Sequence, residues 1–243
     1  MSNIYEALEQ VSAKKTSAGI TPELALQTDV VRAVTLSAEM TWLHHQVEAL
    51  LTNTSNKMIQ FVGSRRGEGV STIVREFAKV AVERHGKSVL VLDSAYQNPG
   101  NKININVTCE YGFMDLLHEG DLSEKAIFRV GDSNLYFAPV SVQASLVSPV
   151  KDLAVMINAW NRLKEKFDLI LIDSSSDANS SESIAMSRSV DGVMMVIEAE
   201  RTRKKSVKKI KDRIISNGGN IIGIILNKRK YYIPEYLYKI FIE

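Results

Sequence analysis

The alternation of short apolar runs with helical stretches restricts the fold of this chain more than any other feature. Runs rich in Val, Ile and Leu predict buried strands, at 58–62, 88–92, 135–140, 169–172, 193–197 and 221–226. Apolar residues at helical spacing predict helices, at 30–51, from 73 to a stop at Gly86, and at 150–166, 182–189 and 202–216. Buried strands that alternate with helices are typical of an α/β fold, in which helices flank a mostly parallel sheet.

Four predicted strands end on residues that are suited to ligand binding: Gly63, Asp93, Asp173 and Asn227. In parallel sheets, ligands bind beyond the carboxyl ends of the strands. We therefore expect the functional site at this edge. Asp93 and Asp173 are its candidate catalytic carboxylates and, together with Ser71, the candidate ligands of a magnesium ion.

A glycine-rich segment, GSRRGEGVST at 63–72, joins the first of these strands to a helix. Glycines let backbone N–H groups turn inward, and the helix N-terminus adds partial positive charge, so such a loop can cradle phosphates. A turn that binds no ligand is the alternative interpretation. The candidate nucleotide-binding residues are Gly63, Arg65, Arg66, Gly67, Glu68, Gly69, Val70, Ser71 and Thr72, with Asn227 at the end of the last strand.

The loop lacks its principal cation. Phosphate loops read G-x-x-x-x-G-K-[ST], with the lysine on the β/γ-phosphates and the hydroxyl on magnesium. Here Gly69 and Ser71 fit the pattern, but Val70 stands at the lysine position, and an isopropyl group cannot neutralise phosphate. Arg65 or Arg66 could supply charge from the other side of the loop, although a planar guanidinium does not duplicate a flexible ammonium.

With these flanking segments, the chain resembles the bacterial tyrosine kinases of exopolysaccharide and capsule assembly, which are related to Min-type and plasmid-partition ATPases. The matching passages are GEG at 67–69 with Ser71 and Thr72, VLVLD at 89–93 followed by Pro99, YGFMDLL at 111–117, NLY at 134–136, FDLILID at 167–173, VDGV at 190–193 and GIILN at 223–227. The resemblance implies a P-loop NTPase fold over 30–230 that binds ATP or ADP with magnesium. It also implies a membrane-bound polysaccharide co-polymerase or export protein, or an active kinase homologue, as partner.

The chain departs from the family pattern at several motifs. The family's second strand is followed by an aspartate and an arginine at alternate positions, where this chain has Ala95 and Gln97. The third motif, which in the family ends with an aspartate, two residues and a proline, continues as serine at 174–176. The family's first helix assembles a homo-oligomer through a glutamate and two arginines, and here Glu39, Trp42 and His45 stand in their places.

These departures favour an accessory or regulatory protein of exopolysaccharide biosynthesis and export over an enzyme. Phosphoryl transfer depends on positioning and charge neutralisation, and removing one preorganised contact costs on the order of 3 kcal/mol. Weak binding of ATP or ADP with magnesium is still expected. The alternatives are an active ATP-dependent protein-tyrosine autokinase and, third, a partition-like ATPase on membrane or DNA.

Three further segments bear on partners. Residues 1–29 predict a short amphipathic helix and a tether. Arg201 to Arg213 form a helix with a basic outer face, which is either a solvated face or a contact for anionic lipid, an acidic partner or, least favoured, DNA. The 231–243 tail holds four tyrosines that are either phosphoacceptors or docking residues, Tyr231, Tyr232, Tyr236 and Tyr238.

Composition narrows the class of protein. The single cysteine, Cys109, excludes an internal disulfide framework and fits a reducing compartment. No apolar run approaches the roughly 20 residues of a membrane span, so we expect a cytoplasmic protein that is peripheral to the inner face of the cell membrane. The four histidines (44, 45, 85 and 118) are not expected to form a metal site.

Overall fold

The computed structural model describes residues 33–52, 54–94, 112–113, 126–140, 153–174 and 181–229. The predicted N-terminal helix and tether, Cys109 and the four tail tyrosines lie outside these residues. The described elements, in chain order, are α2 (Ala33–Leu50), β1 (Lys57–Gly63), α3 (Val70–His85), β2 (Val89–Asp93), β3 (Phe128–Arg129), β4 (Leu135–Pro139), α4 (Leu153–Lys166), β5 (Leu169–Ser174), α5 (Ser181–Met186), the 3-10 turn η3 (Ser187–Ser189), β6 (Gly192–Glu198), α6 (Lys204–Ser216) and β7 (Ile221–Asn227).

The described strands form one seven-stranded sheet in the order β3-β4-β2-β5-β1-β6-β7. All neighbouring pairs are parallel except β3 with β4. The predicted α/β fold with a mostly parallel sheet is therefore confirmed. The antiparallel strand β3 was not predicted, because two residues, Phe128 and Arg129, are too short a segment to carry a periodic signal.

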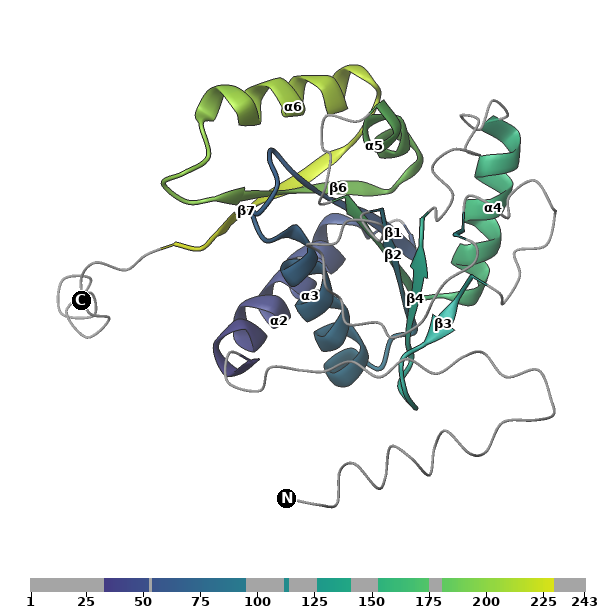
Figure 1. The fold of residues 1–243 in the computed structure, drawn as a ribbon. Helices are drawn as coiled ribbons and strands as arrows, with labels where there is room; N and C mark the ends of the chain where they lie inside the picture. Colours follow the sequence, from purple (N-terminus) through teal and green to yellow (C-terminus); the bar gives the residue numbers. More distant parts are fainter. Residues whose placement is uncertain are drawn as a thin grey trace.

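Helices cover both faces of the sheet (Figure 1). On one face α2 and α3 pack over β1, β2 and β5, with Phe61 and Phe77 completely buried between the layers. On the other face Trp160 of α4 packs on Ile170 and Ile172, and Ile210 and Ile214 of α6 pack on β6. Residues on successive strand positions face opposite layers, which explains why the central strands read as continuous apolar runs.

The predicted end of α3 is confirmed. Gly86 has a left-handed backbone (φ 62°), and the end of the helix is capped by the Gly86 N–H, which donates to the Val82 carbonyl, and by the Lys87 N–H, which donates to the Ala81 carbonyl. This conformation is accessible to glycine at little cost, so the chain can turn sharply from α3 into β2.

Several predicted boundaries differ from the structure by a few residues, as at α3, which begins at Val70, and α6, which begins at Lys204. Strand β2 begins at Val89, because the N–H and hydroxyl of Ser88 both donate to the Asp168 carboxylate. The stretch predicted as one helix at 182–189 is instead α5 followed by η3. None of the described helices is long and apolar enough to span a membrane.

Candidate functional site

The glycine-rich loop lies between β1 and α3, at the carboxyl edge of the sheet, as predicted. Gly67 and Gly69 have left-handed backbones (φ 89° and 94°), which turn the chain into the first turn of α3. Because the first N–H groups of a helix have no partner within the helix, those of Val70 to Thr72 are available at the loop. The loop thus has the backbone shape that suits a phosphate group.

The side chain at the lysine position is apolar and packs against the start of the loop, since a Cβ on Gly63 would lie 3.0 Å from Val70 Cγ2. Val70 is 2% exposed and packs in the core between α3 and the sheet, with Ile73 and Val74. Its backbone N–H still lies at the helix N-terminus, but the residue adds no charge to the loop.

A buried carboxylate fills the opening of the loop instead. Glu68 is completely buried and accepts hydrogen bonds from the N–H groups of Ser64 and Arg65, the latter at 3.0 Å, and from the Ser64 hydroxyl at 2.7 Å. The hydroxyl of Thr202, which precedes α6, also donates to Glu68. Hence the loop opening and the start of α6 are tied together through one side chain.

Two residues at the end of β7 hold the other side of the loop. The Asn227 amide donates to the backbone carbonyl of Glu68 at 2.8 Å, and the Lys228 ammonium donates to that of Gly67 at 2.6 Å. Asn227 is a predicted site residue. Lys228 was missed, because a lysine just beyond a strand gives no signal in the sequence that distinguishes it from a surface residue.

A second buried carboxylate lies beside the loop and forms ion pairs with three cations. Glu198, the last residue of β6, lies 2.7 Å from Arg65 Nη2, 3.2 Å from Arg201 Nη1 and 3.7 Å from Lys228 Nζ. Burial opposes ionisation of this carboxyl, but the hydrogen bonds from Arg201 and Arg65 outweigh burial and hold its pKa below the ordinary value. Arg65, one of the two candidates for a substitute cation, is thus paired with Glu198 beside the loop.

Two of the three predicted magnesium ligands are neighbours in the sheet. Asp93 and Asp173 end the pairing of β2 with β5 in direct register, and both are almost completely buried. Carboxylates and a hydroxyl such as that of Ser71 are donors that magnesium accepts. Within the described residues, no group of three or more His, Cys, Asp or Glu side chains could hold a metal ion by itself. These donor types suit a magnesium ion that also takes phosphate oxygens as ligands.

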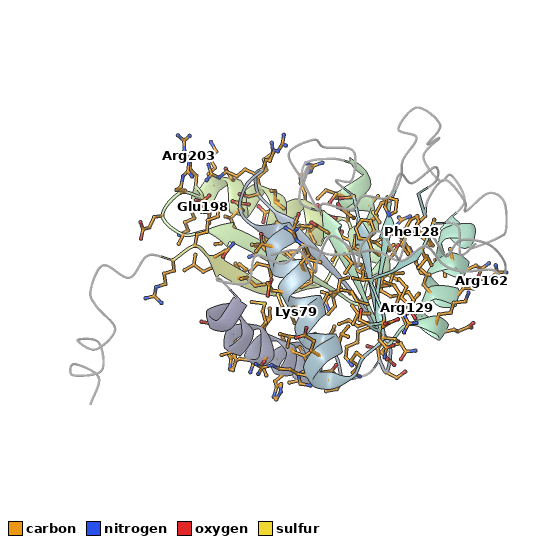
Figure 2. The ribbon with its side chains drawn as sticks, turned by 60° about the horizontal axis from the view of Figure 1, so that its bottom comes forward. Lys79, Phe128, Arg129, Arg162, Glu198 and Arg203 are labelled. Atoms are coloured by element: carbon orange, nitrogen blue, oxygen red, sulfur yellow. The ribbon has the colours of Figure 1, made fainter. Side chains whose placement is uncertain are left out.

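The predicted basic face is present on α6. Its lysines are exposed, and among the described residues none of them makes an ion pair: Lys204, Lys205, Lys208, Lys209 and Lys211. Arg203 precedes this helix and lies on the same side of the molecule as Glu198, away from Arg162 on α4 (Figure 2). The N-terminal end of α6 therefore lies at the loop edge of the sheet, where the Thr202 hydroxyl donates to Glu68.

On helix α2, the residues at the positions that assemble the family's oligomer face outward. Glu39, Trp42 and His45 are all exposed, and Trp42 has 65% of its surface accessible. The inner face of the helix holds Met40, Leu43 and Val47 against α3.

Three of the histidines come together between α2 and α3. The rings of His44 and His85 stack in parallel with centroids 3.9 Å apart, and His45 meets His85 edge-on. Burial, and then the charge of His85, lower the pKa of His44 to about 4, and burial also lowers that of His85. This cluster could not be predicted, since His85 is distant from the other two histidines in the chain.

Comparison with known proteins assigns this arrangement to a family. Residues 56–212 match the family described as cellulose biosynthesis protein BcsQ. The chain is 26% identical over 188 residues to the tyrosine-protein kinase CpsD of Streptococcus agalactiae, covering 74% of this chain and 78% of CpsD. It is 24% identical over 185 residues to the succinoglycan biosynthesis transport protein ExoP of Rhizobium meliloti, covering 74% of this chain but 23% of ExoP.

Solved structures show the same fold. The kinase domain of the Escherichia coli tyrosine kinase ETK superposes with a TM-score of 0.68 at 18% identity, covering 94% of this chain and 91% of that one. The chimerical protein CapA2B2 gives 0.68 at 19%, covering 92% and 99%. The septum site-determining protein MinD of Pyrococcus horikoshii, in complex with Mg-ADP, gives 0.52 at 22%, covering 76% of each chain. The predicted resemblance to bacterial tyrosine kinases and Min-type ATPases is confirmed.

Proposed function

The chain belongs to the family described as cellulose biosynthesis protein BcsQ, and from this starting point we propose that it is an accessory or regulatory component of exopolysaccharide biosynthesis and export. In this proposal its nucleotide motifs are degraded and it acts by contact with partners rather than by phosphoryl transfer. Its similarity to tyrosine-protein kinases and to a succinoglycan biosynthesis transport protein supports a role in polysaccharide assembly, and the valine at the lysine position of the loop supports a loss of kinase activity.

The observation that carries the proposal is the burial of Val70. The side chain at this position is buried with Ile73 and Val74 and carries no charge that could contact a phosphate. This chain has Ala95 and Gln97 where the family pattern has an acid and an arginine, so two further charges that phosphoryl transfer would use are missing. Because charge neutralisation provides most of the catalysis in phosphoryl transfer, efficient turnover is not expected.

The site nevertheless supports binding of a nucleotide. Asp93 and Asp173 with Ser71 would hold magnesium, and the loop N–H groups with Asn227 would hold the rest of an ATP or ADP molecule. The chain's own residues would bind and orient this nucleotide. Once bound, the nucleotide would order the residues at the loop edge. We infer weak binding, since the loop itself contributes no lysine.

The partner in this proposal is a membrane-bound polysaccharide co-polymerase or export protein, or an active kinase homologue. The ExoP relative is named as a transport protein, and the CapA2B2 structure is a chimera. The exposed lysines of α6 would add attraction to anionic lipid at the inner face of the cell membrane. The exposed Trp42 face of α2 would allow a homo-oligomer or a mixed oligomer with a kinase.

A complementation experiment separates contact from catalysis. A strain that lacks the gene would receive the wild-type chain, the double variant Ser71→Ala with Asp93→Asn, or the variant Trp42→Asp. The proposal predicts normal polysaccharide export with the double variant and reduced export with Trp42→Asp, at equal protein levels. Loss of export with the double variant alone would show that a nucleotide-dependent activity, such as the autokinase, is needed.

A further inference from the structure

Lys228 lies at the loop in a conformation that the backbone does not favour. It has a left-handed backbone (φ 54°), which a non-glycine residue seldom adopts, and its N–H is held by the side-chain oxygen of Asn227 at 2.8 Å. Within the described part of the chain, only Glu200 shares this property, and it too flanks the loop edge, two residues beyond Glu198. Left-handed residues of this kind cost free energy and are retained where the surroundings require them.

This conformation directs the ammonium of Lys228 to the loop. Its Nζ donates to the Gly67 carbonyl at 2.6 Å, and Gly69 is close enough that a Cβ there would lie 4.0 Å from the Lys228 Cε. The side chain is about half exposed (47%), so its ammonium can reach a ligand that arrives from solvent. The chain thus places a lysine at its phosphate loop from β7 rather than from α3.

The charges around this lysine do not balance. Glu198 is the acceptor for three cations, Arg65, Arg201 and Lys228. The other carboxylate at the loop, Glu68, accepts hydrogen bonds from the loop N–H groups and two hydroxyls, and it also lies 3.9 Å from Arg65 Nε. Three cations beside two carboxylates leave an excess of one positive charge, which attracts an anion to the loop.

We propose that Lys228 is the lysine of this site, in place of the one that Val70 replaces. In the absence of ligand, Glu198 holds Lys228 and Arg65 beside the loop. When the phosphates of a nucleoside di- or triphosphate occupy the loop, they become the counter-charge of these two cations, and Glu198 competes with the ligand for them. The inference rests on the nucleotide binding in the proposed function and names the residues that provide its charge.

The test is equilibrium binding of a fluorescent ADP derivative with magnesium to the full chain, with inorganic triphosphate as competitor. Lys228→Met should weaken binding about tenfold, as expected for the loss of one charged contact to phosphate, and Lys228→Arg should restore part of it. Glu198→Gln should strengthen binding, because the competing carboxylate is removed while the cations remain. Lys204→Met, on the exposed face of α6, is the matched control and should bind as the wild type does.

Opposite effects of Glu198→Gln and Lys228→Met on nucleotide binding would show that Lys228 provides charge for the ligand and does not only hold the loop in place. If Glu198→Gln and Lys228→Met weaken binding alike, the network is only a structural brace and the proposal is wrong. It is also wrong if Lys228→Met binds as tightly as the wild type, or if the wild type binds neither probe. In those cases the contact role proposed above still stands. Conversely, tyrosine phosphorylation that depends on Lys228 would refute the contact role but support this inference.

Discussion

The side-chain amide of Asn227 lies 2.8 Å from the carbonyl oxygen of Glu68 and donates a hydrogen bond to it, which joins the end of β7 to the phosphate loop. This approach is close because Gly69, the next loop residue, has no side chain: a Cβ there would lie 2.2 Å from the Asn227 nitrogen. The last strand and the loop therefore form one structural unit, although they are at opposite ends of the described chain.

Gly69→Ala should destabilise the protein more than Gly67→Ala. Both glycines have a left-handed backbone, so both substitutions cost about 1 kcal/mol from the backbone. Only at Gly69 does the new methyl group also collide with Asn227, whereas a Cβ at Gly67 meets nothing within 4 Å. Urea unfolding should give a larger loss for Gly69→Ala, by about 1–2 kcal/mol. Equal losses would show that the contact with Asn227 does not restrain the loop.

Glu68→Gln should destabilise the protein by about 1–3 kcal/mol, because one carboxylate oxygen becomes an amide donor that faces other donors. Glu68 accepts hydrogen bonds from Ser64, Arg65 and Thr202 and is completely buried. Glu83→Gln, at an exposed position of α3, is the control and should change the free energy of unfolding by less than about 0.5 kcal/mol. Similar values for the two variants would contradict the assigned role of Glu68.

Stability should fall as the pH decreases from about 6.5 towards 4. The pKa of His44 is lowered to about 4 in the folded protein from 6.5, chiefly by burial, so the unfolded chain binds more protons within this window. By linkage, the contribution of neutral His44 to the free energy of unfolding is fully present above pH 6.5, and it is smaller by about 2 kcal/mol at pH 5. His85, Lys87 and Glu48 face the same ring, and of these Glu48 works in the opposite direction.

The variant His44→Phe tests this assignment. It retains an aromatic ring beside Phe77 and His85 but has no titrating group, so urea unfolding should vary less between pH 7.5 and pH 5 than in the wild type. His45→Phe, on the exposed side of α2, is the matched control. The same pH dependence in His44→Phe as in the wild type would exclude His44 as its source.

Binding to anionic vesicles should depend on α6. The double variant Lys208→Glu with Lys211→Glu should reduce cosedimentation with vesicles rich in phosphatidylglycerol, and added salt should do the same to the wild type, because screening weakens surface attraction. Lys79→Glu with Lys166→Glu, on α3 and α4, changes the net charge equally and should bind normally. If both double variants lose binding alike, net charge rather than the α6 face is responsible.

The sequence predicted the sheet and the loop better than it predicted the network around them. Strands such as β1 and β5 are apolar on both sides, and that pattern is visible in a single sequence. The roles of Glu198 and Lys228 were not predicted, because each depends on which strand lies next to which. The order β1-β6-β7 brings both to the loop, and pairing order is not encoded in local periodicity.

The histidine cluster was missed for the same reason. His44 and His85 lie on different helices, and only the packing of α2 on α3 stacks their rings. By contrast, the helix stop at Gly86 was predicted because a glycine after a periodic segment is a local signal. Local backbone signals could thus be predicted, and contacts between elements could not.

Incubation of the purified wild-type and Val70→Lys chains with radiolabelled ATP and magnesium shows whether the unmodified loop supports phosphoryl transfer. No appreciable phosphate is expected on the tyrosines of the wild-type chain. Val70→Lys should bind the nucleotide more tightly, since a lysine is restored next to Gly69. Appreciable autophosphorylation of the unmodified chain would contradict the claim that its nucleotide motifs are degraded.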